Sequence, residues 1–304
     1  MVLLSDSLPR ASHSTCTGIN VSFEFFPPQT AEMERILWTS ITRLAPLRPE
    51  FVSVTYGAGG TTRERTHATV ARILEETSIK PAAHLTCVGA SCREIDAIAR
   101  DYWEMGVRHI VALRGDPTGG PGRLFVPHAE GYKNSTALVA GLKRIADFEI
   151  TVSAYPEGHP ESPSVDHDID VLKAKIDAGA NRVITQFFFE NEVYLRFLDK
   201  ARAHGITIPI VPGIVPVQNF KQTAVFARRA GAAIPHWLAE RFKGLDDDPT
   251  TRRLIAATVT AEQVFDLVDQ GIDHFHFYTM NRADLVYAIC HLLGVRPKSE
   301  TEAA

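Results

Sequence analysis

Residues 182–205, RVITQFFFENEVYLRFLDKARAHG, contain a strand-like run followed by a helix-like segment. The opening residues, RVITQ, are rich in β-branched side chains, as expected of a short strand. From residue 192 to residue 203 the apolar residues recur at helical spacing. Gly205 comes next, and glycine readily adopts the left-handed conformation that ends many helices. The stretch therefore predicts one strand followed by one helix.

The same pattern recurs along the chain. Strand-like apolar runs lie at 21–25, 51–54, 82–86, 109–113, 150–154, 182–186, 208–212 and 274–277. Helical periodicity lies at 32–43, 64–75, 92–104, 135–145, 168–178, 192–203 and 219–230. Strands that alternate with helices are expected to pair in parallel, because parallel neighbours need long crossovers. Eight such units in about 270 residues favour a single (β/α)₈ TIM barrel, with an open doubly wound sheet as the alternative.

The predicted helix ends support this division. Gly106 and Gly179 follow two of the helical segments, where each glycine can close the last turn. Asp248 and Pro249 provide an N-cap and a first-turn proline for a helix over 250–270. We expect residues 233–248 to form an additional helix and loop before the last strand.

Bulk composition narrows the class of protein. The chain has 304 residues, of which 45% are hydrophobic and 22% charged, and its formal net charge is −4. This balance is typical of a soluble globular protein, with no electrostatic reason to expect a nucleic acid or an anionic membrane as partner. Four cysteines are too few for a disulfide scaffold. No apolar run approaches the roughly 20 residues of a membrane helix, and we predict a cytoplasmic location.

The chain shows no internal linker or change of composition. We expect a loose N-terminal arm over 1–18, which is rich in serine and threonine. A catalytic barrel is predicted over 19–298, followed by a short tail over 299–304.

Functional groups of such a barrel gather at the carboxyl ends of its strands and in the loops that follow. The polar and titratable residues at those positions are Glu24, Thr55, Tyr56, His84, Thr86, Arg114, Asp116, Tyr155, His159, Gln186, Gln222 and Arg282. Loops carry polar residues without any function, so the residues inside apolar runs are the more informative ones.

Glu24 is the clearest of these, because it lies in VSFEFFPP between phenylalanines. A carboxylate is costly to ionise in apolar surroundings, which favours a general acid. A structural pair with a buried cation is an equally weighted explanation. Gln186, in ITQFFFE, is an uncharged donor and acceptor suited to an amide-rich heterocycle, although a satisfied core amide explains it nearly as well.

Three further features have a structural and a functional explanation. The glycine-rich turn 57–62 can bind an anion or form a tight barrel turn, and it matches neither the Rossmann fingerprint nor the P-loop. Asp168 and Lys175 are two helical turns apart, so they form either a solvated charge pair or a contact to a cofactor ribose or diphosphate. The acidic run 246–248 precedes a helix and lacks accompanying histidines, and we predict no metal site.

Eight motifs at successive strand ends together resemble the methylenetetrahydrofolate reductase family. They are FEFFPP, VTYGAGGTTRERT, HLTC, LRGDP, AYPEGHPES, ITQFFF, PGIVPVQNFKQ and HFHFYTMNR, in this order. The resemblance runs from about residue 21 to residue 296. It implies a (β/α)₈ barrel that carries FAD, oxidises NADH or NADPH, and reduces a folate-bound methylene group by ping-pong hydride transfer. Family members are commonly homo-oligomers, and we expect the same here.

The resemblance also implies residue roles. Glu24 corresponds to the general acid, and Asp116 to a catalytic carboxylate near the flavin and the folate. Gln186, Gln222, Phe226 and Arg282 correspond to substrate contacts, together with Asp116. The implied contacts to FAD or the nicotinamide are Thr55, Tyr56, Ala58, His84, Arg114, Gly115, Asp116, Ser135, Tyr155, His159, Asp168 and Lys175.

The chain departs from the family pattern in two places. The loop between Asp116 and Ser135 is longer, and Val171 and Ala174 replace polar cofactor contacts. Two other functions remain as alternatives. A barrel aldolase or lyase would need a metal or a lysine at a strand end, and a non-enzymatic ligand-binding barrel would bind no flavin.

Overall fold

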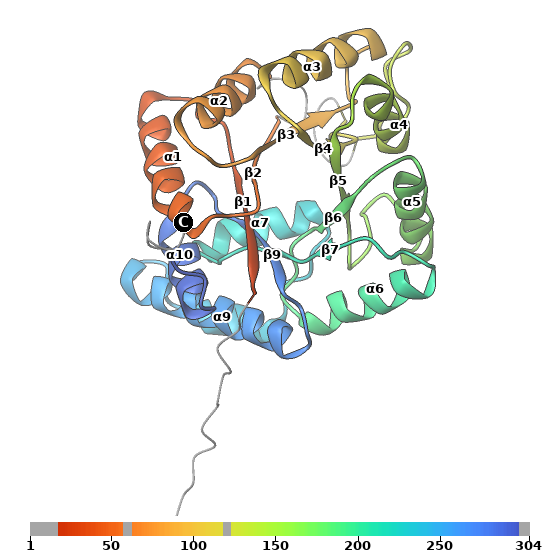
Figure 1. Cartoon of the computed structure of the whole chain (residues 1–304). Coiled ribbons are helices and arrows are strands. Elements are labelled where there is room, and N and C mark those ends of the chain that lie inside the picture. The colour runs from red at the N-terminus through yellow and green to blue at the C-terminus, as the bar shows by residue number, and fades with distance from the viewer. Residues whose placement is uncertain (1–17, 57–62, 118–122, 298–304) are drawn as a thin grey trace, which may run out of the picture.

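Strands and helices alternate along the chain and form a ring of parallel strands surrounded by helices (Figure 1). The computed structural model describes residues 18–56, 63–117 and 123–297. Most of the predicted N-terminal arm, the C-terminal tail and the glycine-rich turn 57–62 lie outside these residues. The predicted barrel is confirmed, and the open doubly wound sheet is excluded.

Within the described residues nine strands form one sheet. They are β1 (Asn20–Phe25), β2 (Val52–Val54), β3 (Pro81–Thr86), β4 (His109–Leu113), β5 (Glu149–Ala154), β6 (Arg182–Thr185), β7 (Ile210–Val211), β8 (Gly213–Ile214) and β9 (His274–Tyr278). The α-helices are α1 (Ala31–Leu44), α2 (Arg63–Glu76), α3 (Cys92–Met105), α4 (Ser135–Ile145), α5 (Val165–Asp177), α6 (Asn191–Ala203), α7 (Phe220–Ala230), α8 (His236–Phe242), α9 (Pro249–Asp269) and α10 (Ala283–Leu292), and a 3₁₀ helix, η1, spans Ala45–Leu47.

The seventh strand of the barrel is divided at Pro212, so that it appears as β7 and β8. The first half pairs with β6, through Val183↔Ile210, and the second half pairs with β9, through Gly213↔His276. Proline has no N–H to donate, but its carbonyl accepts a hydrogen bond of 3.0 Å from the His276 N–H. The two halves join opposite neighbours and close the ring between β6 and β9.

Strand alternation separates an inner layer from an outer layer. Phe23 and Phe25 of β1 are fully buried in the cluster shared with the surrounding helices. A smaller inner cluster consists of Phe51, Ala82, Val111, Ile184 and Val211. Because successive side chains of a strand point to opposite faces, Ser22 and Glu24 face the interior of the barrel.

The helix ends follow the sequence signals. Ser91 and Glu94 form a reciprocal capping box at the start of α3. Asp248 caps α9, whose first residue is Pro249, as predicted. Gly106 ends α3 at a φ of +104°, in the left-handed region that favours glycine. The additional helix expected within 233–248 is α8.

Two boundaries differ from the prediction. Helix α5 begins at Val165, three residues before the expected start, because the Ser164 side chain accepts a hydrogen bond from the His167 N–H. Helix α10 follows the last strand, although its apolar run was not assigned in the sequence.

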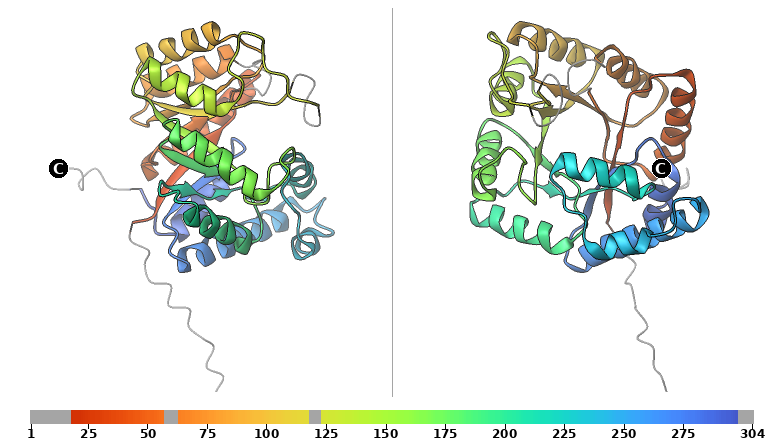
Figure 2. Two further views of the ribbon diagram at one scale, coloured as in Figure 1. Left: turned by 90° about the vertical axis from the view of Figure 1, so that its right-hand side faces the viewer. Right: turned by 180° about the vertical axis from the view of Figure 1, so that it is seen from behind.

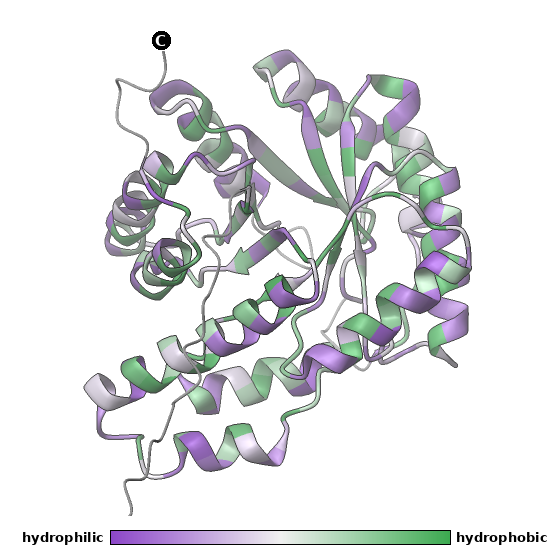
Figure 3. Ribbon diagram, turned by 60° about the horizontal axis from the view of Figure 1, so that its bottom comes forward, coloured by the Kyte–Doolittle hydropathy of each residue, from purple (hydrophilic) through white to green (hydrophobic). Residues whose placement is uncertain are grey.

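The outer helices are amphipathic, as Figure 3 shows by the hydrophilic and hydrophobic bands along them. Seen from behind in Figure 2, α7 lies across one end of the ring. In the described parts of the chain, no helix is both long enough and apolar enough to cross a membrane.

Candidate active site

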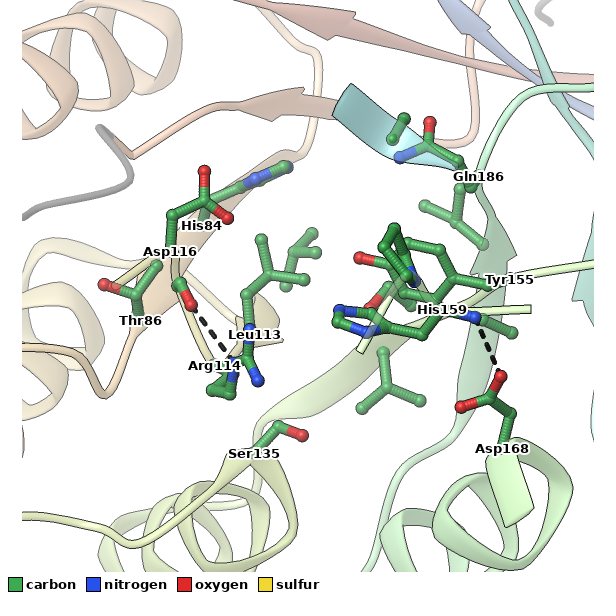
Figure 4. Close-up of a pocket in the computed structure, with 18 of the residues that line it drawn as sticks. His84, Thr86, Leu113, Arg114, Asp116, Ser135, Tyr155, His159, Asp168 and Gln186 are labelled. Carbon is green, nitrogen blue, oxygen red and sulfur yellow. Dashed lines mark hydrogen bonds between the residues drawn. The ribbon is translucent and has the colours of Figure 1, made fainter. Parts of the chain in front are cut away.

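A cavity of about 1470 Å³ opens at the carboxyl ends of the strands. Most of the residues expected there from the sequence line it, and Figure 4 draws part of this lining, with ten of its residues labelled. The predicted site residues in its wall are Glu24, Thr55, Tyr56, His84, Arg114, Gly115, Asp116, Ser135, Tyr155, His159, Asp168, Lys175, Gln186 and Phe226. The barrel therefore brings together side chains that are up to two hundred residues apart in the sequence.

Three predicted residues are not among those that line the cavity in the described structure. Ala58 is outside the described residues. Gln222 and Arg282 are exposed and are not part of the cavity wall. Thr223, which follows Gln222, and Met280, two residues before Arg282, do line it.

Glu24 lies on the inner face of β1, with a side chain that is only 12% exposed. The expectation that phenylalanines surround its carboxylate is wrong. Phe23 and Phe25 point to the opposite face of the strand, because side chains alternate along a strand. Phe26 lines the cavity but is 38% exposed.

Two buried histidines face the Glu24 carboxylate instead. Its Oε2 atom lies 3.4 Å from Nε2 of His84 and 3.7 Å from Nε2 of His276. Neither Nε2 atom has a hydrogen-bond partner within the described residues. Burial lowers the pKa of the His84 ring, which therefore favours its neutral form. These three groups can hold and move a proton at one end of the cavity.

The other nitrogen of His276 is fixed by a hydrogen bond. Its Nδ1 lies 2.7 Å from the Ser22 hydroxyl, on the same inner face of the barrel as Glu24. His276 and Tyr278 were not among the residues predicted for the site, although HFHFY alternates in the manner of a strand with two faces. That alternation was the signal that could have placed both residues inside the barrel.

Tyr278 is partly buried in the wall of the cavity. Its hydroxyl donates a 2.8 Å hydrogen bond to the Thr185 carbonyl of β6. Burial raises the pKa of this hydroxyl well above its ordinary value, and the nearby Glu24 charge adds to the shift. Tyr278 is thus a neutral hydrogen-bond donor in the wall.

The loop after β4 positions Arg114 and Asp116. The Arg114 guanidinium forms an ion pair of 2.6 Å with Glu161 and lies 4.7 Å from the Phe125 ring centroid. Gly115 has a φ of +85°, and a Cβ at that position would lie 2.6 Å from Val88. This turn is therefore restricted to glycine, and it places the Asp116 carboxylate in the wall of the cavity, as labelled in Figure 4.

The loop after β5 forms another part of the wall. The rings of Tyr155 and His159 meet edge to face, with centroids 4.6 Å apart. The His159 N–H donates a 2.8 Å hydrogen bond to the Asp168 carboxylate, which fixes this loop on α5 (Figure 4). Burial raises the pKa of Tyr155 and lowers that of His159, so both rings are neutral near pH 7.

Lys175 is a buried cation in the wall. Its ammonium donates a 3.0 Å hydrogen bond to the Ser153 carbonyl. Burial lowers the pKa of this ammonium to about 8. The explanation of Asp168 and Lys175 as a solvated charge pair is therefore wrong, because only 8% of Lys175 is exposed.

Gln186 follows β6, and its side chain is oriented by the backbone. Its amide oxygen accepts a 3.1 Å hydrogen bond from the Phe187 N–H. The amide nitrogen is then available to the cavity, which Gln186 lines. Gln186 can accordingly donate to a carbonyl or ring nitrogen of a bound heterocycle.

The other polar groups present no metal centre. No cluster of three or more histidine, cysteine, aspartate or glutamate side chains suited to a metal ion occurs in the described part of the chain. The wall also contains Thr86, whose buried hydroxyl has no partner among the described residues. Thr86 and His84 each have a buried polar atom that can form a hydrogen bond with a ligand.

Comparisons with known proteins agree on one family. Residues 11–294 match the family model described as methylenetetrahydrofolate reductase. The chain is 54% identical to the 5,10-methylenetetrahydrofolate reductase of Escherichia coli (strain K12) over 292 residues, which covers 96% of each chain. It is 35% identical to methylenetetrahydrofolate reductase 1 of Schizosaccharomyces pombe over 280 residues, which covers 91% of this chain and 46% of the relative.

The fold also resembles a solved structure. A Clostridium thermocellum protein, described as binding two copies of 5-methyl-5,6,7,8-tetrahydrofolic acid, superposes with a TM-score of 0.60. Its sequence identity is 15%, and the match covers 91% of this chain and 94% of that one. At this identity the similarity supports the barrel fold alone.

Proposed function

Because this chain belongs to the methylenetetrahydrofolate reductase family, we propose that its cavity binds FAD, a nicotinamide dinucleotide and a folate. The chain is an oxidoreductase that reduces 5,10-methylenetetrahydrofolate to 5-methyltetrahydrofolate, in folate one-carbon metabolism. The family generally uses FAD and NADH or NADPH. The observation that carries the site assignment is the Glu24 carboxylate, which faces two partnerless imidazole nitrogens in the wall of a large cavity.

The cavity fits a flavin dinucleotide. Its volume of about 1470 Å³ exceeds the roughly 300–1,000 Å³ of an ordinary small-molecule site, which leaves space for a second ligand beside the flavin. The buried and partnerless atoms of His84 and Thr86 can hydrogen-bond a heterocycle. Lys175 offers a buried cation to a phosphate. FAD, when bound, supplies the hydride chemistry that couples nicotinamide oxidation to folate reduction.

We assign the proton transfer to Glu24. The five-membered ring of the methylene substrate must open to an electrophilic iminium before it can accept a hydride. A protonated carboxyl at Glu24 donates to the departing ring nitrogen, and the neutral His84 ring is placed to exchange that proton. General acid catalysis of this kind contributes about 10²–10⁴-fold to a rate.

The remaining side chains orient the substrates. Asp116 lies in the wall where its charge acts on both the flavin and the folate, and Gln186 donates to the pterin or to the nicotinamide. Phe226 is 41% exposed on α7 and offers a ring for stacking. We assign Gln222 and Arg282, which are exposed and outside the cavity wall, to the distal end of the folate.

We also assign contacts to the two cofactors. Thr55 is assigned to the nicotinamide. The flavin contacts are Tyr56, Ala58, His84, Arg114, Gly115, Asp116, Ser135, Tyr155, His159, Asp168 and Lys175, of which Ala58 lies outside the described residues.

The decisive experiment follows the flavin anaerobically. The purified protein is expected to be yellow, to bleach with NADH or NADPH, and to regain its colour when methylenetetrahydrofolate is added. A preparation that is folded but colourless, and that binds no added FAD, would reject the cofactor assignment. Three properties stay predictions: the barrel boundaries 19–298, the homo-oligomeric state and the cytoplasmic location. Light scattering can test the oligomeric state.

A further inference from the structure

The last turn of α7 carries two arginines beside the cavity. Arg228 and Arg229 are both exposed, and both line the cavity wall. Neither guanidinium forms an ion pair or a hydrogen bond with a residue in the described ranges. Basic side chains at a helix C-terminus complement the helix dipole, but that effect requires no cavity.

The position of this turn is fixed by the loop after β5. Gly231 ends α7 at a φ of +75°, and a Cβ there would lie 2.9 Å from the Pro160 ring. The Ala233 N–H donates a 2.7 Å hydrogen bond to the Glu157 carboxylate. The two arginines are therefore held next to the loop that carries Tyr155 and His159.

The other cations of the cavity are already engaged. Arg114 is paired with Glu161, and the buried Lys175 ammonium donates to the Ser153 carbonyl. In contrast, the two α7 arginines have no partner among the described residues.

The α5 side of the cavity lacks further cations. It presents Val171 and Ala174 to the cavity, where the family pattern has polar cofactor contacts. A dinucleotide nevertheless carries at least two phosphate charges into this space. Arg228 and Arg229 are thus the lining cations that have no partner among the described residues, and they add to Lys175 as groups that can meet a phosphate.

The neighbouring ring on α7 points to a nucleotide. Phe226 and Arg229 are three residues apart, so they are neighbours on the helix surface. A base that stacks on Phe226 carries its ribose and phosphate towards the next turn of the helix. An arginine at that turn can bind the phosphate with two parallel hydrogen bonds, which makes arginine more suitable than lysine.

We propose that Arg228 and Arg229 form a phosphate-binding subsite for a dinucleotide at the mouth of the cavity. This inference rests on the proposed function, which places FAD and a nicotinamide in the cavity. The phosphate has three sources: the diphosphate of FAD, the diphosphate that NADH and NADPH share, and the 2′-phosphate of NADPH. NADH lacks the last of these groups, so flavin release and the two donors together distinguish between the sources.

The test compares the double variant Arg228→Gln/Arg229→Gln with the wild-type holoenzyme. Arg241→Gln is the matched control, because Arg241 pairs with Glu262 on α8 and α9 and does not line the cavity. Three quantities are measured: flavin release on dilution, followed by fluorescence; the KM for NADH and NADPH in flavin reduction; and the KM for mono- and triglutamyl folate.

The double variant is expected to weaken one phosphate contact by about tenfold. A tenfold higher flavin dissociation constant identifies the FAD diphosphate. A tenfold higher KM for NADPH alone identifies the 2′-phosphate, and a rise of the same size for NADH and NADPH identifies the diphosphate that they share. The control should match the wild type in both.

Two results would overturn the subsite. One is a double variant that matches the wild type in flavin release and in both donors. The other is a rise confined to the KM for triglutamyl folate, which would assign the arginines to folate carboxylates. A wild-type protein that binds no flavin rejects the proposed function itself and is distinguishable from both.

Discussion

The Oε2 atom of Glu24 lies 3.4 Å from Nε2 of His84, inside the barrel and at the wall of its cavity. The two side chains come from β1 and β3, with β2 between them in the sheet. Since burial favours the neutral ring of His84, this imidazole can exchange a proton with the Glu24 carboxyl group. The pair thus provides a place for proton transfer in the cavity.

Replacing Glu24 should separate the two half-reactions. Glu24→Gln keeps the size and polarity of the side chain but cannot donate a proton as a carboxyl does. We expect folate reduction to slow by about 10²–10⁴-fold, while NADH or NADPH oxidation with an artificial acceptor is retained. Stopped-flow measurement of each half-reaction tests this, with the exposed Glu32→Gln as control. Full folate activity in Glu24→Gln would remove the residue from its role.

Asp116→Asn should alter the flavin potential. Loss of a negative charge in the cavity wall stabilises the reduced flavin and makes the potential less negative, by on the order of tens of millivolts. Folate turnover should fall at the same time. A spectroelectrochemical titration gives the potential, and Asp101→Asn on α3 is an exposed control. Identical potentials and folate kinetics in variant and wild type would contradict this assignment.

Lys175→Met should stabilise the flavin-free protein and weaken flavin binding. Burial lowers the pKa of Lys175 from 10.5 to about 8. The unfolded chain therefore binds more protons between these values, and the charged lysine costs the folded state about 3 kcal/mol below pH 8. This cost disappears as the pH rises to 10.5.

Thermal unfolding of the flavin-free proteins at pH 7 and pH 10 checks the sign. Lys175→Met should have the higher Tm at pH 7, and the difference should shrink at pH 10. Flavin release should be faster in the variant, because a phosphate loses its cation. Equal unfolding of both proteins at pH 7 would show that the lysine costs nothing.

His109 should make the barrel sensitive to acid. Burial lowers the pKa of its ring from 6.5 to about 3, with a contribution from the Arg182 charge. Between these values the unfolded chain binds more protons, so the free energy of unfolding falls as the pH drops below 6.5. From pH 7 to pH 5 the loss is about 2 kcal/mol.

His109→Gln offers the matched comparison, because an amide can still hydrogen-bond the Thr151 hydroxyl that lies 2.7 Å from the ring. Urea unfolding at pH 7 and pH 5 should show about 2 kcal/mol less acid loss in the variant. The same acid loss in both proteins would show that His109 is not the group responsible.

The sequence predicted the barrel and most of the cavity wall because both follow from local rules. Strand periodicity located the eight segments, and the position of Asp116 or His159 after a strand was enough to place it at the carboxyl end. The surroundings of Glu24 depend on long-range pairing, which local periodicity does not contain. Glu24 lies opposite Tyr278 in the register of β1 and β9, 254 residues apart in the chain.

The wrong expectation of a phenylalanine enclosure has the same origin. Adjacency in FEFF does not mean proximity in space, because Phe23 and Phe25 contact the helices. The sequence also does not single out Arg228 and Arg229, because a basic helix end is common and only the position of α7 brings them to the cavity wall.

The division of the seventh barrel strand at Pro212 affects how easily the barrel opens locally. Only two residue pairs join β7 to β6, and only two join β8 to β9. We therefore expect the backbone hydrogen bonds of the ring to open most easily at this divided strand. The Tyr278 hydroxyl links β9 to β6 across it by donating a hydrogen bond to the Thr185 carbonyl, in the wall of the cavity. Amide hydrogens of residues 210, 211, 213 and 214 should therefore exchange early with solvent deuterium, and earlier still when this phenol is replaced by Tyr278→Phe.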